Sequence, residues 1–186
     1  MKDAFLTRSF LSLMLLFFSN LASSDANLEY KIKAGYLYNF TKFITWPALK
    51  SPTFNLCILG SDPFGEVIDP IENKTAFNRA IKIVRLSEES FLSSSASQID
   101  CHILYLGGVN DTPLILEKIR AYPKQADRLI VGDGGEAIAN GEMINFINRD
   151  GKIKIQIDLQ SVKQTDLKIS AKLLEIAELF REPSHE

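Results

Sequence analysis

The 186-residue sequence contains few of the residues on which catalysis and metal binding depend. It has two histidines, His102 and His185, two cysteines, Cys57 and Cys101, and neither a His-Glu-x-x-His nor a Cys-x-x-Cys motif. No set of zinc ligands is therefore visible. Side chains of adjacent strand residues point to opposite faces, which excludes Cys101 and His102 as a catalytic pair. The sequence predicts a protein that is not an enzyme, with no metal site and no cofactor.

Basic residues are not concentrated anywhere in the sequence. The chain has 21 Lys and Arg against 23 Asp and Glu, for a formal net charge of −2. Nucleic-acid binding requires a basic patch, so nucleic acid is not an expected partner.

The longest apolar run stands near the start of the chain. Lys2 and Arg8 give a positive start, Phe10 to Phe18 is apolar except for Ser12, and small residues follow at 22–24. This pattern predicts a secretory signal peptide over residues 1–24, with cleavage after Ala26 as the alternative. An uncleaved anchor is a weaker interpretation, because a membrane span needs about 20 apolar residues. Residues 25–186 contain no linker or repeat, and we expect a single domain in the periplasm.

The two cysteines lie in apolar segments that both read as strands, 54–60 and 101–107. An even number of cysteines in an exported protein favours a disulfide between Cys57 and Cys101. The alternative is a pair of buried free thiols. Neighbouring strands would bring the two Cα atoms within bridging distance.

Strands and helices alternate along most of the chain. The predicted helices cover 28–44, a short segment from Pro63 or Phe64, a segment from Ser87, and 112–121; the predicted strands cover 54–59, 80–86, 101–106 and 128–131. Such alternation predicts an α/β fold with a mostly parallel sheet of about six strands and helices on both faces. In the first helix, apolar spacing suggests a core face made of Leu28, Ile32, Tyr36, Phe40 and Phe43.

The end of the chain departs from this alternation. Segments 143–148 and 152–158 alternate with period two around Asp150-Gly151, which predicts an antiparallel hairpin. A short helix or turn over 158–164 should follow. A final amphipathic helix is expected over 167–180, with Leu167, Leu174, Ala177 and Leu179 as core contacts, and then a frayed tail from Glu182.

Three glycine loops follow predicted parallel strands and should therefore gather at one edge of the sheet, where open α/β folds bind ligands. They supply candidate ligand-binding residues for an anion held by backbone N–H groups: Gly60, Ser61, Asp62, Gly107, Gly108, Gly132 and Gly134. The alternative is that these glycines only form tight turns and helix starts.

The first helix contains more aromatic residues than one face against a sheet requires. Tyr30, Tyr38 and Trp46 lie away from the predicted core face and are candidate partner-binding residues, because interfaces recruit exposed aromatic side chains. An unusually aromatic core helix is the alternative.

Several of these segments together resemble the YfiR-like family of periplasmic regulators, over nearly the whole chain after the signal peptide. The resemblance rests on Tyr30-Lys-Ile-Lys-Ala-Gly-Tyr-Leu-Tyr-Asn-Phe-Thr-Lys-Phe-Ile-Thr-Trp-Pro47, Leu56-Cys-Ile-Leu-Gly-Ser-Asp-Pro-Phe-Gly65, Cys101-His-Ile-Leu-Tyr-Leu106, Gly141-Glu-Met-Ile-Asn-Phe146, Ile155-Gln-Ile-Asp-Leu159 and Leu167-Lys-Ile-Ser-Ala-Lys-Leu-Leu174.

This resemblance implies an α/β periplasmic regulator without enzymatic activity. It further implies repression of an inner-membrane diguanylate cyclase through the periplasmic portion of that enzyme, which lowers cyclic-di-GMP and restrains biofilm formation. The resemblance also allows two further interactions, with an outer-membrane lipoprotein and with a second copy of this chain in a homodimer. A second disulfide known in the family cannot form here, because the sequence has only two cysteines. The alternative function is a periplasmic small-ligand-binding protein that feeds a transporter or a sensor kinase.

Overall fold

The computed structural model describes residues 21–47, 49–93, 100–121, 128–135 and 141–180. Most of the predicted signal peptide, residues 1–20, and the predicted tail from Glu182 lie outside the described residues. Of the helices in the described ranges, none has the length and apolar character that a membrane crossing requires.

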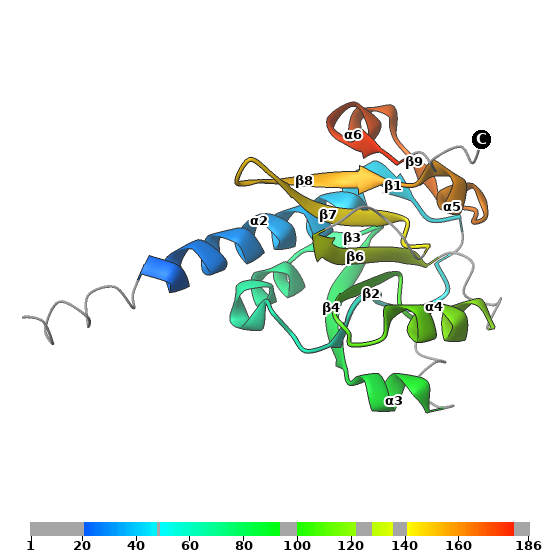
Figure 1. Cartoon of the computed structure of the whole chain (residues 1–186). Coiled ribbons are helices and arrows are strands. Elements are labelled where there is room, and N and C mark those ends of the chain that lie inside the picture. The colour runs from blue at the N-terminus through cyan, green and yellow to red at the C-terminus, as the bar shows by residue number, and fades with distance from the viewer. Residues whose placement is uncertain (1–20, 48, 94–99, 122–127, 136–140, 181–186) are drawn as a thin grey trace, which may run out of the picture.

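An eight-stranded sheet in the order β10-β8-β7-β6-β5-β2-β4-β3 forms the centre of the molecule (Figure 1). From β4 to β7 the neighbouring strands run parallel, as do β10 and β8, whereas β7–β8 and β3–β4 are antiparallel. The strands are β2 (Phe54–Gly60), β3 (Thr75–Ala76), β4 (Arg79–Leu86), β5 (Ile103–Gly108), β6 (Leu129–Gly135), β7 (Ile144–Arg149), β8 (Lys152–Ile157) and β10 (Glu178–Leu179). The predicted α/β class with a mostly parallel sheet is confirmed, and the sheet has two strands more than the expected six or so.

The central strand β2 shows why the apolar runs become strands. It pairs in parallel with β4 on one side and β5 on the other, so both of its faces lie inside the molecule. Six of its seven residues are buried. A strand covered on both faces must be apolar along its length, which is the pattern of this segment.

The predicted hairpin is confirmed. β7 and β8 pair with Arg149 opposite Lys152, and the two turn residues between them, Asp150 and Gly151, have φ values of 53° and 73°. Positive φ at both positions is what a two-residue hairpin turn of this hand requires, and Asp-Gly adopts it readily.

Helices lie on both sides of the sheet (Figure 1). The long helix α2 (Leu21–Phe43) crosses one face, where the ring of Phe40 stacks on that of Phe146 at 6.3 Å. It is accompanied there by two short 3₁₀ helices, η2 (Gly65–Val67) and η3 (Asp69–Asn73). The opposite face carries α3 (Glu88–Leu92) and α4 (Thr112–Arg120), whose starts are capped by Ser87 and Asp111.

The predicted core face of α2 is wrong in its first half. Lys33, Leu37 and Phe40 are buried against the sheet, whereas Leu28 and Ile32 are 58% and 41% exposed on the opposite side of the helix. The apolar spacing misled the prediction because a charged residue, Lys33, lies on the buried face, for a reason described below.

The predicted final helix over 167–180 is also wrong. This segment forms a short strand, a helix of one and a half turns and another short strand, which are β9 (Lys168–Ile169), α6 (Ala171–Ile176) and β10. The strand β9 pairs with β1 (Ile44–Thr45), and β10 joins the edge of the main sheet. Ser170 starts α6 by accepting a hydrogen bond from the Leu173 N–H. The predicted turn at 158–164 is confirmed as α5 (Leu159–Lys163).

Candidate functional site

A hollow of about 290 Å³ lies where α2 passes the carboxyl ends of β5 and β6. These are the strand ends at which open α/β sheets bind ligands, so the hollow is the candidate site. It also reaches the β7–β8 hairpin, so that segments far apart in the sequence meet at it. The residues around it are Glu29, Tyr30, Lys33, Gly107, Asp133, Gly134, Phe146, Ile147, Asn148 and Ile153.

A buried ion pair forms the wall of the hollow. The Lys33 Nζ donates hydrogen bonds of 2.7 Å to both carboxylate oxygens of Asp133, and the two side chains are only 4% and 8% exposed. The same ammonium donates to Glu29, one helical turn earlier, whose side chain is 37% exposed. The hydroxyl group of Tyr105, on the neighbouring strand β5, donates a hydrogen bond to Asp133. The network therefore ties α2 to β5 and β6.

Burial and hydrogen bonding shift the pKa values of Lys33 and Asp133 in opposite directions. Burial alone would lower the pKa of Lys33, but its bonds to Asp133 and Glu29 outweigh that effect, and the pKa is raised. Burial raises the pKa of Asp133, against the opposing influence of Lys33 and Tyr105. Burial, and then the charge of Asp133, raise the pKa of Tyr105. Lys33 is therefore cationic at neutral pH and Tyr105 stays a neutral donor, a pairing that stabilises the Asp133 carboxylate.

Aromatic rings surround the Lys33 ammonium. The Tyr30 ring centroid lies 4.7 Å from Nζ and the Phe146 centroid 5.9 Å from it, both within cation–π range. Phe64 links this group to the interior, because its ring contacts both Tyr30 and Tyr105 edge to face. Lys33 thus lies in a desolvated setting in which its charge is matched.

The glycine loops do gather at this edge of the sheet, but they differ in what they do. The backbones of Gly60 and Gly108 lie in direct contact, because a Cβ on Gly60 would lie 2.2 Å from the Gly108 carbonyl oxygen. The backbone N–H of Ser61 donates a hydrogen bond of 3.0 Å to the same oxygen. This close backbone contact explains both glycines without a ligand.

Gly107 has a different role, because a Cβ there would lie 2.2 Å from the hydroxyl oxygen of Tyr105. Glycine at this position gives Tyr105 the space to reach Asp133. Gly132 is restricted by Asn145, whose Oδ1 would lie 2.9 Å from a Cβ, whereas Gly134 has open space and faces the hollow. Of the predicted ligand-binding residues, only Gly107 and Gly134 line the hollow.

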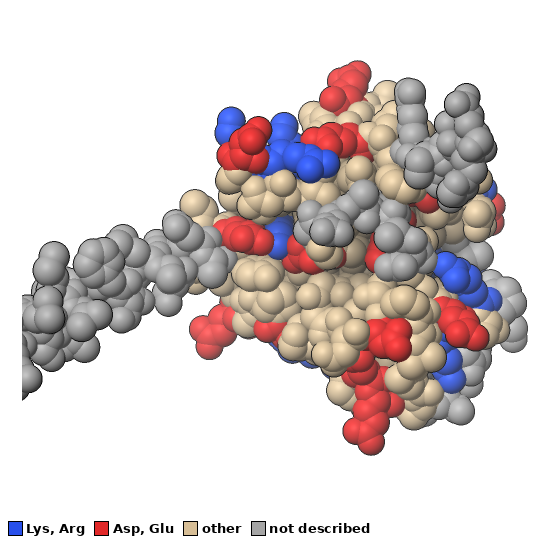
Figure 2. Space-filling view, viewed as in Figure 1, with Lys and Arg blue, Asp and Glu red and all other residues tan. Residues whose placement is uncertain are grey.

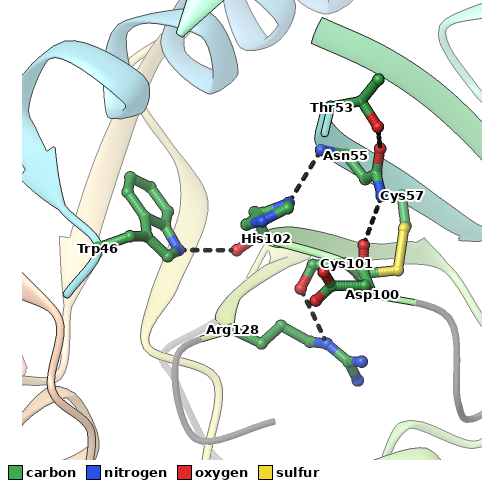
Figure 3. Close-up of a disulfide and its surroundings, with 8 residues drawn as sticks. All are labelled: Trp46, Thr53, Asn55, Cys57, Asp100, Cys101, His102 and Arg128. Carbon is green, nitrogen blue, oxygen red and sulfur yellow. Dashed lines mark hydrogen bonds between the residues drawn. A yellow bond between two sulfur atoms is a disulfide. The ribbon is translucent and has the colours of Figure 1, made fainter. Parts of the chain in front are cut away.

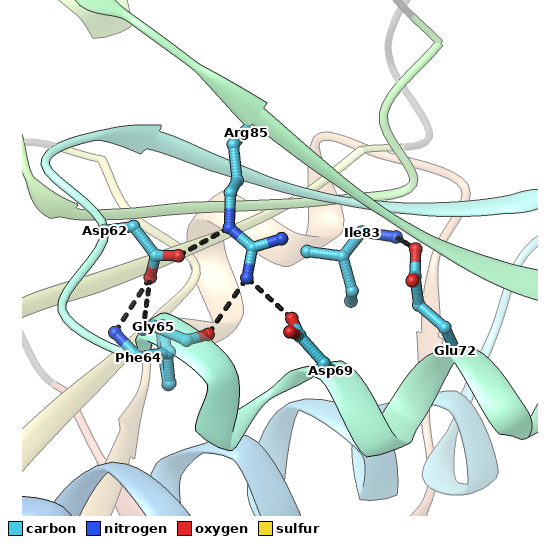
Figure 4. Close-up of polar contacts among 7 residues, drawn as sticks. All are labelled: Asp62, Phe64, Gly65, Asp69, Glu72, Ile83 and Arg85. Carbon is cyan, nitrogen blue, oxygen red and sulfur yellow. Dashed lines mark hydrogen bonds and ion pairs between the residues drawn. The ribbon is translucent and has the colours of Figure 1, made fainter.

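Asp62 belongs to a separate polar cluster (Figure 4). It accepts a hydrogen bond of 2.6 Å from Arg85 Nε and bonds from the backbone N–H groups of Phe64 and Gly65. Arg85 also donates to Asp69 at 2.7 Å. Asp62 therefore holds the turn before η2 and neutralises Arg85, which gives it a structural role.

The three predicted partner-binding residues lie in different surroundings. Tyr30 is half-buried at the hollow, and Tyr38 is half-buried on the flank of α2 with the Lys42 ammonium 4.9 Å from its ring. Trp46 is buried, and its ring packs against Phe54 and Phe77. The expectation that Trp46 is exposed for a partner is therefore corrected: it is a core residue.

The predicted disulfide is present (Figure 3). Cys57 on β2 and Cys101, just before β5, are bonded with a Cα–Cα distance of 5.8 Å. Around it, Asn55 donates its side-chain N–H to the Asp100 carbonyl, and Arg128 donates to the Cys101 carbonyl. Burial lowers the pKa of Arg128 to about 10, which leaves it charged at neutral pH.

His102 lies beside the disulfide in its neutral form. It is buried and stacked on Phe54, and its Nδ1 accepts a 2.9 Å hydrogen bond from the Asn55 backbone N–H. Burial lowers the pKa of His102 below its usual value; Arg79 and Arg128 act in the same direction, and Asp100 opposes them.

We expect this histidine to make folding stability depend on pH. Below about pH 6.5 the unfolded chain binds a proton at His102 that the folded chain does not. The stability is therefore full above pH 6.5 and falls as the pH decreases toward the lowered folded-state pKa. Urea unfolding at pH 7.5 and 5.5 measures the loss. His102→Asn, which keeps an acceptor for Asn55, should reduce the difference; an unchanged pH dependence in that variant would contradict the assignment.

Sequence reasoning missed the network that forms the wall of the hollow. Glu29, Lys33 and Asp133 were not singled out, although the i, i+4 spacing of Glu29 and Lys33 is a recognisable helix ion pair. The feature of the sequence that could have pointed to Asp133 is its position between Gly132 and Gly134, in the third of the glycine loops. Its pairing with Lys33 spans 100 residues of sequence, which no local pattern reports. In the described part of the chain, no three His, Cys, Asp or Glu side chains are grouped as a metal ion would require.

Comparison with models of protein families identifies the family of this chain. A model of the family described as YfiR/HmsC-like matches residues 30–178, from the turn of α2 that carries Tyr30 to the last strand of the sheet. No curated protein matches the sequence.

Proposed function

The chain belongs to the YfiR/HmsC-like family of periplasmic regulators, and from this premise we propose that it is a periplasmic protein that binds and represses an inner-membrane diguanylate cyclase. It acts by contact with the periplasmic portion of the cyclase and so lowers cyclic-di-GMP. An outer-membrane lipoprotein that relieves this repression is part of the same proposal. The family is regulatory and not catalytic, which supports a function by binding.

The observation that supports a contact function is the outer face of α2, defined by Leu28, Lys31, Ile32, Gly35 and Asn39. All five residues are exposed, and Leu28 and Ile32 are large apolar side chains one helical turn apart. A Cβ on Gly35 would meet no atom within 4 Å, so a partner can approach the helix backbone closely. Exposed apolar residues grouped on one helix face are typical of protein interfaces.

The charged residues do not suggest another kind of partner. Figure 2 shows acidic and basic side chains interspersed on the visible face. Tyr38 borders the outer face of α2 and remains a candidate contact. Tyr30 is a less informative residue to change, because it packs on Phe64 and on the Lys33 ammonium.

We expect deletion of the gene to raise cyclic-di-GMP and to promote surface attachment. The double variant Leu28→Ser/Ile32→Ser should reproduce the deletion while folding normally, since both side chains are exposed. Loss of an interface anchor commonly costs about 2 kcal/mol, or roughly thirtyfold in affinity. Cyclic-di-GMP measured in strains that carry each variant checks this result.

Matched controls are available elsewhere on the surface. Leu114→Ser in α4 and Ile176→Ser in α6 replace apolar side chains that are 44% and 56% exposed but lie outside α2, and they should leave repression intact. Unchanged cyclic-di-GMP in the deletion strain would refute the regulatory role. Normal repression by the folded Leu28→Ser/Ile32→Ser variant would refute only the choice of surface.

A further inference from the structure

The hollow beside Lys33 has an excess of negative charge. Its described lining contains two carboxylates, Glu29 and Asp133, and one ammonium, that of Lys33. The formal sum of these side chains is one net negative charge, in a setting where burial weakens solvent screening. This balance is the reverse of what the glycine loops led us to expect, which was a site for an anion.

Lys33 cannot serve an anion, because its hydrogen-bonding capacity is already used. An ammonium group has three N–H donors. Lys33 directs its donors to both oxygens of Asp133 and to Glu29. A bound anion would have to displace one of these carboxylates and would meet repulsion from the other.

Acceptors, in contrast, remain available. An ionised carboxylate offers about four lone-pair positions, and Glu29 is the most exposed member of the network. Beside it stand the exposed Asn148 and the partly buried side chains of Tyr30 and Ile153. A volume of about 290 Å³ is close to the lower limit of known small-molecule sites, so the occupant must be small.

We propose that this hollow binds a small organic cation, a primary amine with a short apolar body. Its ammonium group donates to Glu29, and its body lies against Tyr30 and Ile153. Binding of an amine in this hollow does not depend on cyclase repression, which is tested separately by measuring cyclic-di-GMP.

Three probes with the same phenylethyl body and different charge test the inference on the full exported chain: phenethylamine, 3-phenylpropionate and 2-phenylethanol. Titration followed by amide chemical shifts should show that phenethylamine binds at least tenfold more tightly than either of the others. The shifts should centre on Glu29, Gly134 and Asn148. Glu29→Gln keeps an acceptor for Lys33 but removes the charge, and it should weaken phenethylamine binding about tenfold.

The matched control is Glu175→Gln, an exposed carboxylate on α6 outside the hollow, which should bind phenethylamine as the parent protein does. The inference is overturned if 3-phenylpropionate binds as tightly as phenethylamine. It is overturned equally if no probe binds the folded protein at millimolar concentration, or if Glu175→Gln weakens binding as much as Glu29→Gln.

Discussion

Replacement of Lys33 by Met should lower the free energy of unfolding by about 3–5 kcal/mol. The substitution leaves the Asp133 carboxylate, 8% exposed, without the ammonium that bonds both of its oxygens. Removing one partner of a buried ion pair lowers the free energy of unfolding far more than the intact pair raises it. The remaining charge stays buried, with neither water nor an opposite charge to stabilise it. Urea unfolding of the purified variant measures the change.

A double-mutant cycle separates this effect from lost packing. Asp133→Asn removes the opposite charge but keeps an acceptor for Tyr105, so Lys33→Met/Asp133→Asn should be less destabilised than the sum of the single variants. Glu29→Gln changes a more exposed partner of the same ammonium and should cost less than about 1 kcal/mol. Strictly additive losses in the cycle would show that Lys33 and Asp133 are not coupled.

Loss of the disulfide should have an effect of similar size. The bond between Cys57 and Cys101 closes a loop with a sequence separation of 44, for which the chain-entropy model gives roughly 4 kcal/mol. Both cysteines are buried, so Cys57→Ala/Cys101→Ala also removes some packing. The midpoint of urea unfolding should also fall when the parent protein is reduced with dithiothreitol, and by somewhat less, because reduction keeps both side chains.

The double variant is its own control for the reductant, since dithiothreitol should not shift its midpoint. Labelling under denaturing conditions should find no free thiol in the exported protein before reduction. Two reactive thiols, or equal midpoints for the oxidised and reduced protein, would contradict a stabilising disulfide.

The sheet was predictable because its signals are local. The apolar run of β2, the alternation along β7 and β8 and the Asp150-Gly151 turn each specify a strand or a turn within a few residues. The same is true of the helix starts at Ser87 and Asp111, where a side-chain oxygen caps the first turn. The disulfide followed from the parallel neighbours β2 and β5, which place Cys57 close to Cys101.

The orientation of α2 was not predictable from periodicity, since its buried face contains a lysine and its exposed face contains Leu28 and Ile32. Apolar spacing assigns the core face correctly only where charged residues point to solvent. Lys33 violates that rule because Asp133, far away in the sequence, neutralises it. The exposed Leu28 and Ile32 violate it in the opposite sense, and they lie on the outer face of α2 that we propose as a contact surface.

The last segment was misassigned for a similar reason. Residues 167–180 have helical apolar spacing, yet two pairs of them form strand contacts with β1 and β8. These partners lie elsewhere in the sequence, and the helix that remains, α6, has only six residues. Tertiary pairing thus overrode the local preference.

The contacts of α2 and β1 also set the order in which the molecule can assemble. Lys33 contacts Asp133, Phe40 contacts Phe146 and Ile44 pairs with Ile169. The start of the described chain is therefore fixed by residues that lie about 100 or more positions later. Until β7 is in place, Phe40 lacks the ring of Phe146 that covers it. Contacts of such long sequence separation slow folding. A chain that ends at Asp166 would lose β9, the strand that pairs with β1, and should remain unfolded.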